Sequence, residues 1–449
     1  MFETLKKAFK EKEIRVKIWW TLLFLLLYRV GCHIPVPGVG TKLLTEEFGS
    51  LSYLNIMSMM TGGSLANGTF FAMGIGPYIN ASIIMQLLAV AIPPLERLSK
   101  QGEEGRKKIA SYTRYLAVLL AVVQSIGILV SYGQLDTVGN SDVPTLSAIL
   151  AGSAANANGF TNFLSYVIII LFYTAGTCVT IWIGERITDY GVSNGISLLI
   201  FAGIIASAGI FFGQQFTGIF ADGGFDRLSF LYLVIYVLIV VVVFAAIVFV
   251  DLAERKIQVQ YAKQVKGRKM YGGQSTVIPI KVNANGVMPL IFAFSILTFP
   301  ELIMTLFGWS DALSWWGTWL GSTSRYPFYA ILLSLLVVFF AFFYSQIQFN
   351  PEDISKTIQQ NGGFIPGIRA GKPTAEYLKK ISNRLTLFGA IFLALLALIP
   401  SVVLNLIPTV SGGGAFNATG MLICVSVALE FNTALESQII QKNYKGFLK

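Results

Sequence analysis

The chain has 449 residues, of which 54% are hydrophobic and only 12% are charged. Soluble domains carry about 25% charged residues, so this composition indicates a membrane as the solvent and excludes an ordinary soluble enzyme. The net charge of +10 is not evidence for nucleic-acid binding, because in a membrane protein the position of Lys and Arg along the chain matters more than their sum.

The N-terminal segment, residues 1–17, is expected to be an amphipathic helix on the cytoplasmic membrane surface. Phe2, Leu5 and Phe9 recur in it at helical spacing among lysines. The segment lacks the apolar core and the small-residue cleavage site of a removed signal peptide.

Apolar runs of about 20 residues, the length of a membrane-spanning helix, recur along almost the whole chain and predict an all-α polytopic protein. The ten expected spans are 18–34, 73–92, 113–132, 159–183, 196–213, 228–250, 285–304, 328–347, 386–404 and 419–436. All 33 Lys and Arg residues except Arg29, Lys42, Arg227 and Arg325 lie in or beside the segments on one side of these spans. The positive-inside rule therefore places both termini, including the tail 437–449, in the cytoplasm.

Residues 57–71, before the second span, are rich in helix-breaking residues. Thr61, Gly62, Gly63 and Ser64 are followed by Asn67 and Gly68. Such a segment forms no membrane helix of its own and must lie against protein or water. Its composition alone favours a re-entrant or external loop.

The first long cytoplasmic loop, 251–284, carries seven basic residues against Asp251 and Glu254. Apolar and polar residues alternate over 257–261, and 277–280 is a second short extended run, so we expect a β-hairpin. Its tip is expected near 266–269.

The second long cytoplasmic loop, 348–384, opens with a helix-start signal. Asn350 is a good N-cap, Pro351 suits the first helical position, and two acids follow in the first turn. The predicted helix ends at Asn361-Gly362-Gly363, and a second short helix is expected from about Thr374. Structured basic loops of this kind indicate a docking surface for ribosomal RNA or for an acidic protein.

Seven short stretches, spread over nearly the whole chain, resemble one known family. They are 34–38 (IPVPG), 74–86 (GIGPYINASIIMQ), 102–107 (GEEGRK), 193–197 (SNGIS), 271–276 (YGGQST), 350–353 (NPED) and 363–369 (GFIPGIR). In this order, and on a ten-span background, they are similar to the SecY family, the pore-forming subunits of bacterial protein-translocation channels. The resemblance implies two inverted five-helix halves, 18–213 and 228–436, around an hourglass pore.

The resemblance also implies a function without catalysis, cofactor or metal. Members of the family move unfolded secretory polypeptides across the plasma membrane and release hydrophobic segments sideways into lipid. Their implied partners are the small membrane subunits SecE and SecG, the motor ATPase SecA, the ribosome, signal peptides with nascent chains, and membrane lipids.

Matching positions assign four groups of site residues. The pore ring comprises Ile75, Ile79, Ile196, Ile200, Ile291 and Ile423, and its two i,i+4 pairs each share one helix face. The plug, a short helix in the family, lies at 57–71 and includes Thr61, Gly62, Gly63, Ser64 and Asn67. The polar residues of a lateral gate between the second and seventh helices are Gln86, Asn194 and Asn285. The docking residues for motor and ribosome are Lys263, Lys266, Arg268, Lys269, Arg369 and Lys372.

The alternative class is a secondary transporter of small solutes. Such proteins carry ionisable residues near the membrane midplane. In the expected spans we count only Arg29 near one end and Glu430 in the last helix, which argues against ion coupling. An intramembrane enzyme would need a nucleophile or metal ligands, whereas the chain has a single histidine and three widely separated cysteines. There is no Walker-type phosphate loop, so energy must come from partners.

Overall fold

The structure is a computed structural model that describes residues 2–37, 39, 58, 61–134, 159–220, 227–261, 264–266, 269–271, 275–283, 286, 288–307, 309–320, 328–405 and 418–447. The chain divides into two compact units. The first unit consists of Met1–Tyr236, Ser295–Tyr329 and Leu404–Lys449, and the second of Val237–Phe294 and Ala330–Val403. This division differs from the predicted halves 18–213 and 228–436, which stay a prediction. Each unit is described by itself.

The two N-terminal helices of the first unit are α1 (Phe2–Lys10) and α2 (Lys12–Gly31). The predicted amphipathic helix is present as α1, and it packs on protein: Ala8 is fully buried in one apolar cluster with Ile14, Val192 and Leu435. Leu435 belongs to the C-terminal helix α17 (Ala418–Phe447). The two ends of the chain therefore pack together.

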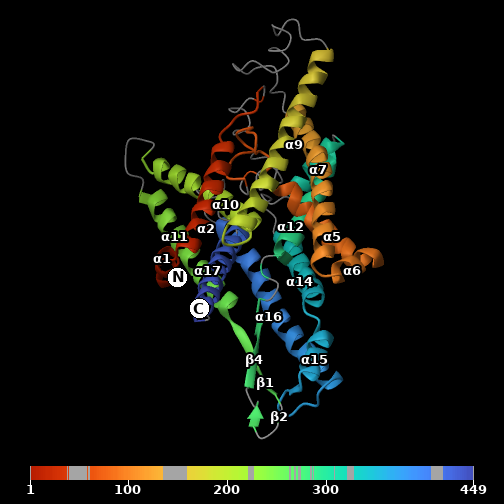
Figure 1. Ribbon diagram of the computed structural model, residues 1–449. Coiled ribbons are helices and arrows are strands. Elements are labelled where there is room, and N and C mark those ends of the chain that lie inside the picture. The colour runs from red at the N-terminus through yellow and green to blue at the C-terminus, as the bar shows by residue number, and fades with distance from the viewer. Residues whose placement is uncertain are drawn as a thin grey trace. The chain divides into compact units, whose positions relative to one another are not determined.

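Six further helices of the first unit lie between these ends in the sequence. They are α5 (Gly76–Ala91), α6 (Pro93–Lys100), α7 (Glu103–Gln134), α9 (Gly159–Tyr190), α10 (Gly195–Gly218) and α13 (Ser310–Leu320). The chain bends by 106° between α5 and α6, as Figure 1 shows, where Pro93 forces Ile92 into an extended conformation. An ion pair of 2.6 Å between Arg114 and Glu185 joins α7 to α9.

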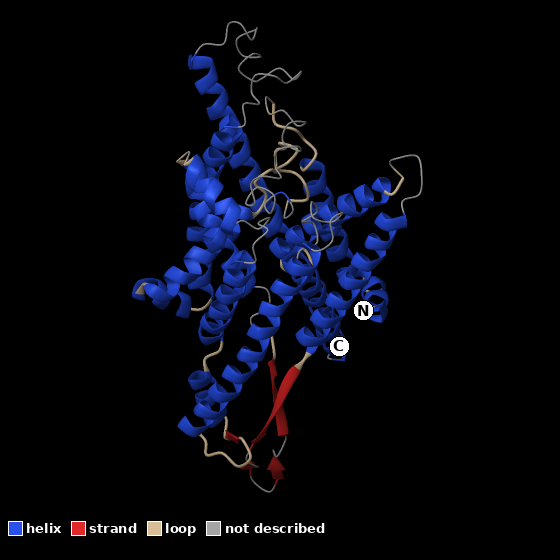
Figure 2. Ribbon diagram, turned by 180° about the vertical axis from the view of Figure 1, so that it is seen from behind, coloured by secondary structure: helices blue, strands red, loops and turns tan. Residues whose placement is uncertain are grey.

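The second unit combines long helices with all the strands that the structure describes, and Figure 2 shows these strands gathered at one end of it. Its helices are the larger parts of α11 (Arg227–Leu252), α14 (Phe328–Gln348) and α16 (Lys372–Asn405), the start of α12 (Met288–Leu306), and α15 (Pro351–Gln360). A hydrogen bond of 2.8 Å between the buried hydroxyls of Ser345 and Thr386 joins α14 to α16.

The predicted basic hairpin is confirmed. β1 (Glu254–Tyr261) pairs antiparallel with β4 (Ser275–Lys281), and β2 (Gln264–Lys266) pairs with β3 (Lys269–Tyr271) towards the tip. A third strand, β5 (Gly363–Phe364), adds to the other edge of β1 and was not predicted. Alternation along β1 buries Ile257 and Val259 against Ile358, Ile365 and Leu378, so the two long loops 251–284 and 348–384 share one apolar core.

The second loop differs in one respect from the prediction. Asn350 caps α15 by accepting a hydrogen bond from the Glu352 amide at 3.2 Å, and α15 ends beside Gly362, as expected. The predicted separate helix from Thr374 is wrong, because α16 starts at Lys372 and continues without a break through the ninth predicted span.

A helix occupies most of each of the ten predicted spans, but not all of these helices are both long and apolar enough to cross a membrane. Within the described residues, seven helices are long and apolar enough to cross a membrane, or eight if the bent pair α5 and α6 counts as one. α2 carries Arg15, Lys17 and Arg29 within its 20 residues, and the apolar part of α12 is short. The chain is thus a helical multi-pass membrane protein, and the number ten stays a prediction.

The count of charges in the predicted spans was incomplete. Glu301 lies in α12, inside the predicted span 285–304, and only 5% of it is exposed. Arg114, near the start of the span 113–132, and Glu436, at the end of the span 419–436, were also left out of the count.

Candidate functional site

Residues 61–71 of the first unit form consecutive turns that are packed inside protein. We call this stretch the seated segment. Gly62, Gly63 and Gly68 have φ angles of 70°, 84° and 57°, a region that glycine enters without strain. The hydroxyls of Ser64 and Thr69 donate to the carbonyls of Thr61 and Ser64 at 3.0 and 3.1 Å. Residues 61–71 are therefore not helical, and the predicted plug over 57–71 stays a prediction. Of residues 57–60, only residue 58 is described.

Backbone hydrogen bonds anchor the seated segment to the stretch that follows α2. The Val36 amide donates to the Gly68 carbonyl at 3.0 Å, and the Phe70 amide donates to the Ile34 carbonyl at 2.8 Å. Thr69 and Pro35 form an isolated antiparallel bridge between these two bonds. The segment thus forms a short extended pair with residues 34–36, which follow α2 in the chain.

Apolar side chains hold the seated segment against three helices. Leu65 is fully buried in a cluster with Met73, Ile128 of α7 and Tyr173 of α9. The Phe71 ring stacks on Tyr28 of α2 with centroids 5.6 Å apart. A segment with this much buried surface has a defined seat.

Small residues on the neighbouring helices make room for this seat. A Cβ atom at Gly176 of α9 would overlap the Phe70 carbonyl, and one at Gly31 of α2 would overlap the Phe71 ring. On the segment itself, a Cβ at Gly62 would overlap the Arg29 guanidinium and lie 3.1 Å from the Gly203 carbonyl of α10. The backbone of the segment therefore approaches α2, α9 and α10 as closely as glycine permits.

The predicted pore-ring residues of the first unit lie on helices that adjoin the seated segment. Ile75, 5% exposed, is the N-cap of α5 and follows the segment through Gly74, and Ile79 lies one turn on. Ile196 and Ile200 lie in the first two turns of α10, about two turns and about one turn before Gly203 respectively.

The last two members of the predicted ring lie elsewhere. Ile423, 4% exposed, is on α17, which packs against α10. Ile291 is partly buried on α12, in the second unit. The first unit therefore brings five of the six predicted ring residues onto three helices, and a complete ring stays a prediction.

The predicted gate residues make local hydrogen bonds. The Gln86 side-chain amide donates to the Ser82 hydroxyl of its own helix at 3.2 Å. The Asn194 carboxamide oxygen caps α10 by accepting from the Ile196 amide at 3.1 Å. Asn285 lies outside the described residues. A hydrogen-bonded gate seam stays a prediction.

The predicted docking residues that the structure describes lie on the two long loops of the second unit. Lys266 and Lys269 face each other across the last pair of the β2–β3 ladder. Arg369 is exposed, and its carbonyl accepts a hydrogen bond from the Thr374 hydroxyl at 2.8 Å, which fixes the tip to the start of α16. Lys372 is the exposed first residue of α16. Lys263 and Arg268 lie outside the described residues.

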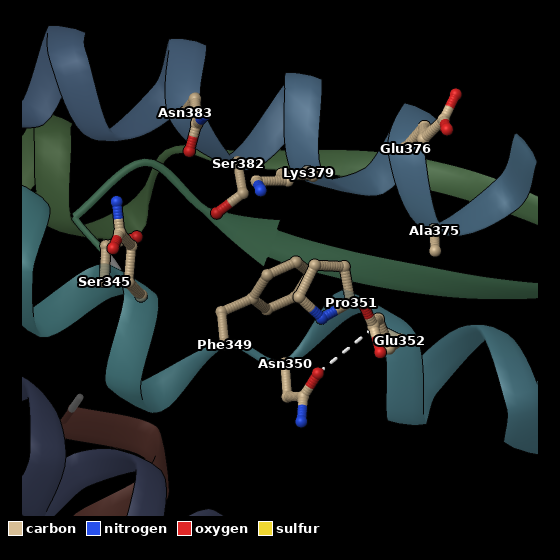
Figure 3. A pocket seen from close by; sticks show the side chains of 11 residues that line it. Ser345, Phe349, Asn350, Pro351, Glu352, Ala375, Glu376, Lys379, Ser382 and Asn383 are labelled. Atoms are coloured by element: carbon tan, nitrogen blue, oxygen red, sulfur yellow. Dashed lines mark hydrogen bonds between the residues drawn. The ribbon is translucent and has the colours of Figure 1, made fainter. Parts of the chain in front are cut away.

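A polar pocket of about 470 Å³, which the sequence did not indicate, lies at the base of the second loop. Phe349, Asn350 and Pro351, at the junction of α14 and α15, face Lys379 and Ser382 on α16 in Figure 3. Its polar lining includes both acidic and basic groups. Within the described part of the chain, no three His, Cys, Asp or Glu residues are grouped to hold a metal ion.

Comparison with known proteins identifies the family of this fold. A family model described as SecY matches residues 69–432. The protein translocase subunit SecY of Streptomyces coelicolor is 42% identical to this chain over 463 residues, which cover 100% of both. The chain belongs to the SecY family. The Bacillus licheniformis member, also described as protein translocase subunit SecY, is 39% identical and likewise covers 100% of both chains.

Solved structures agree on the fold. A SecY protein, whose plug domain is described as stabilising the closed state of the translocation channel, superposes with a TM-score of 0.65 at 20% identity, covering 95% of this chain and 93% of its own. Sec61 in the canine ribosome-channel complex superposes with a TM-score of 0.60 at 18% identity over the same shares. The SecY family fold thus accounts for the helices around the seated segment.

Proposed function

We propose that this chain is the pore-forming subunit of a bacterial protein-translocation channel, which moves unfolded secretory polypeptides across the plasma membrane and releases hydrophobic segments sideways into lipid. Full-length relatives carry the name protein translocase subunit SecY, which supports this function over a transporter of small solutes. The observation that carries the proposal is the seated segment, a non-helical stretch that leads into α5 at Ile75 and lies against Gly203 of α10, about one turn after Ile200.

The six isoleucines of the ring suit this task because of their chemistry. A narrow aliphatic constriction expels water and so blocks ions, while its alkyl chains adapt to any side chain that passes. Selectivity for one substrate would need fixed polar groups, which these six positions lack. The seated segment, residues 61–71 of the predicted plug 57–71, would close the idle channel and leave its seat when a polypeptide enters.

Sideways release follows from a comparison of energies. A hydrogen bond across a helix seam in a membrane contributes about 0.6–2 kcal/mol. A signal segment of about 12 apolar residues, each favouring lipid by about 0.3–0.6 kcal/mol, gains several kcal/mol on leaving the pore. An arriving segment can therefore displace the polar contacts proposed for Gln86, Asn194 and Asn285.

The two cytoplasmic loops would provide the docking surface. The proposed topology has ten spans in two inverted halves and both termini in the cytoplasm, which places the basic loops on the side where polypeptides arrive. The proposed partners are SecE and SecG in the membrane, and SecA and the ribosome at the loops. The shared apolar core of the loops supports a rigid platform for such contacts.

Photo-crosslinking with a stalled secretory polypeptide tests the proposal. Photoreactive residues at Ile79, Ile200 and Ile291 should label the stalled chain. A probe at Ile205, which lies on the same helix α10 but is 48% exposed, should label it far less. Equal labelling at Ile200 and Ile205, or none at the three ring positions, would overturn the pore assignment.

A further inference from the structure

Arg29 is a partly buried cation, and one of its nitrogens is enclosed without a hydrogen-bond partner in the described part of the chain. It lies in the last turn of α2, and its Nη1 atom is enclosed yet finds no partner among the residues that the structure describes. A guanidinium stays charged in proteins and has five N–H donors to satisfy. An enclosed donor of this kind is a rare and costly feature.

The surroundings of Nη1 show what encloses it. The atom lies directly against Gly62, where the positive φ angle of 70° turns the backbone of the seated segment over the guanidinium. The Gly203 carbonyl of α10 lies on the same face of Gly62, 3.1 Å from the position of a Cβ there. Nη1 is therefore enclosed at the place where α2, the seated segment and α10 meet.

Removing the seated segment would change the solvation of this atom. With the segment in place, the donors of Nη1 have exchanged water for a site where the described residues offer no acceptor within hydrogen-bond distance, which disfavours the seated state. With the segment displaced, Nη1 regains water. The opposing forces are the burial of Leu65, the stacking of Phe71 on Tyr28 and the backbone bonds to Ile34 and Val36.

We propose that Arg29 is a gating residue that weakens the seating of residues 61–71, so that the segment leaves its seat when a polypeptide arrives. The inference rests on the proposed function, because only a channel needs a segment that is both well packed and easily displaced. The free-energy cost of enclosing the guanidinium opposes the favourable apolar contacts of the segment. It touches no substrate while the segment is seated.

The population of the displaced state can be measured by cysteine labelling. Thr69, 3% exposed, is replaced by cysteine after Cys32, Cys178 and Cys424 have been changed to alanine, and the channel in vesicles reacts with a membrane-impermeant maleimide. Arg29→Met keeps the length of the side chain and removes the charge and the donors. We expect labelling of Thr69→Cys to slow about fivefold to tenfold in Arg29→Met, the effect of removing one enclosed unpaired donor group. Arg29→Lys keeps the charge but has fewer N–H donors, and its labelling rate should stay within about twofold of the parent.

The opposite sign overturns the inference. If Arg29→Met labels as fast as the parent or faster, Arg29 holds the segment in place and does not weaken it. If Arg29→Met does not accumulate in the membrane, Arg29→Gln provides the same comparison with a neutral polar side chain. A stalled polypeptide in the unchanged channel separates this result from the proposed function: it should speed labelling of Thr69→Cys, and failure to do so would contradict the channel proposal whatever Arg29 does.

Discussion

The seated segment and the basic hairpin loop achieve order in opposite ways. Residues 61–71 have no helix and one isolated bridge, yet Leu65, Thr61 and Ser64 are at most 3% exposed. The hairpin has a regular ladder from Glu254 to Lys281, yet most of the side chains of β1 are exposed. The segment depends on its neighbours for the burial of its apolar side chains, whereas the hairpin carries most of its order in its own pairing. Under the proposed function, the part that has to leave its place is built in the first way, and the docking platform that has to stay is built in the second.

The largest effect should come from reversing a charge on the platform. Arg369 is exposed on a tip that is pinned to α16, so Arg369→Glu should leave the fold intact and abolish motor-driven translocation, because a docked acidic surface would be repelled. Translocation of a purified secretory precursor into vesicles measures this. Arg369→Lys should retain activity, and Lys380→Glu, an equal charge reversal at an exposed site on α16, should have a small effect. Full activity of Arg369→Glu would show that Arg369 has no role in docking.

The seating of residues 61–71 should be most sensitive to substitution of Leu65, the fully buried leucine. Leu65→Ala removes a fully buried side chain from the cluster with Met73, Ile128 and Tyr173, and we expect it to weaken seating by about 2–5 kcal/mol. Ion leak through the idle channel and faster labelling of Thr69→Cys are the measurements. Asn67→Ala changes an exposed residue of the same segment and serves as control. A Leu65→Ala channel that remains tight would show that the segment does not seal the pore.

A smaller loss is expected from one added methyl group. A Cβ at Gly176 would overlap the Phe70 carbonyl, and backbone cannot move aside as a flexible side chain does, so Gly176→Ala should weaken seating by about 1–3 kcal/mol. Gly209→Ala is the matched control, because a Cβ there meets nothing within 4 Å. The same labelling assay compares the two. Equal labelling rates would mean that the close approach of α9 and the segment is absent in the membrane.

The contrast between the two regions also explains what the sequence could reveal. Alternation over 257–261 and the Asn350-Pro351 cap are local signals, so the hairpin and α15 were predicted correctly. The two-residue strand β5 is too short to show a period, and it needs Gly363 because the side chains of Ile358 and Tyr261 come within 3.0 Å of a Cβ there.

The errors have equally physical causes. No proline interrupts the chain between Thr374 and the ninth predicted span, so the short helix expected there continues into it as α16. The seat of residues 61–71 was not predictable, because Gly31, Gly176 and Gly203 have meaning only once α2, α9 and α10 are packed. The unpaired nitrogen of Arg29 is likewise a property of the packing. In the sequence, Arg29 was only an arginine near the end of a span.

The smallest effect should come from the cap at the base of the platform. The side chain of Asn350 accepts from the Glu352 amide at 3.2 Å and donates to the Asp353 carboxylate at 2.7 Å, so Asn350→Ala should destabilise the first turn of α15 by about 1 kcal/mol. Hydrogen exchange of the amides in that turn should speed up about fivefold. Asn350→Asp, which can still cap the helix, should exchange like the parent. β1 packs in the apolar core with Leu378 of α16, and this contact does not involve the cap, so hydrogen exchange in β1 should not change. A spread of faster exchange into β1 would mean that the hairpin, like the seated segment, depends on its neighbours for its order.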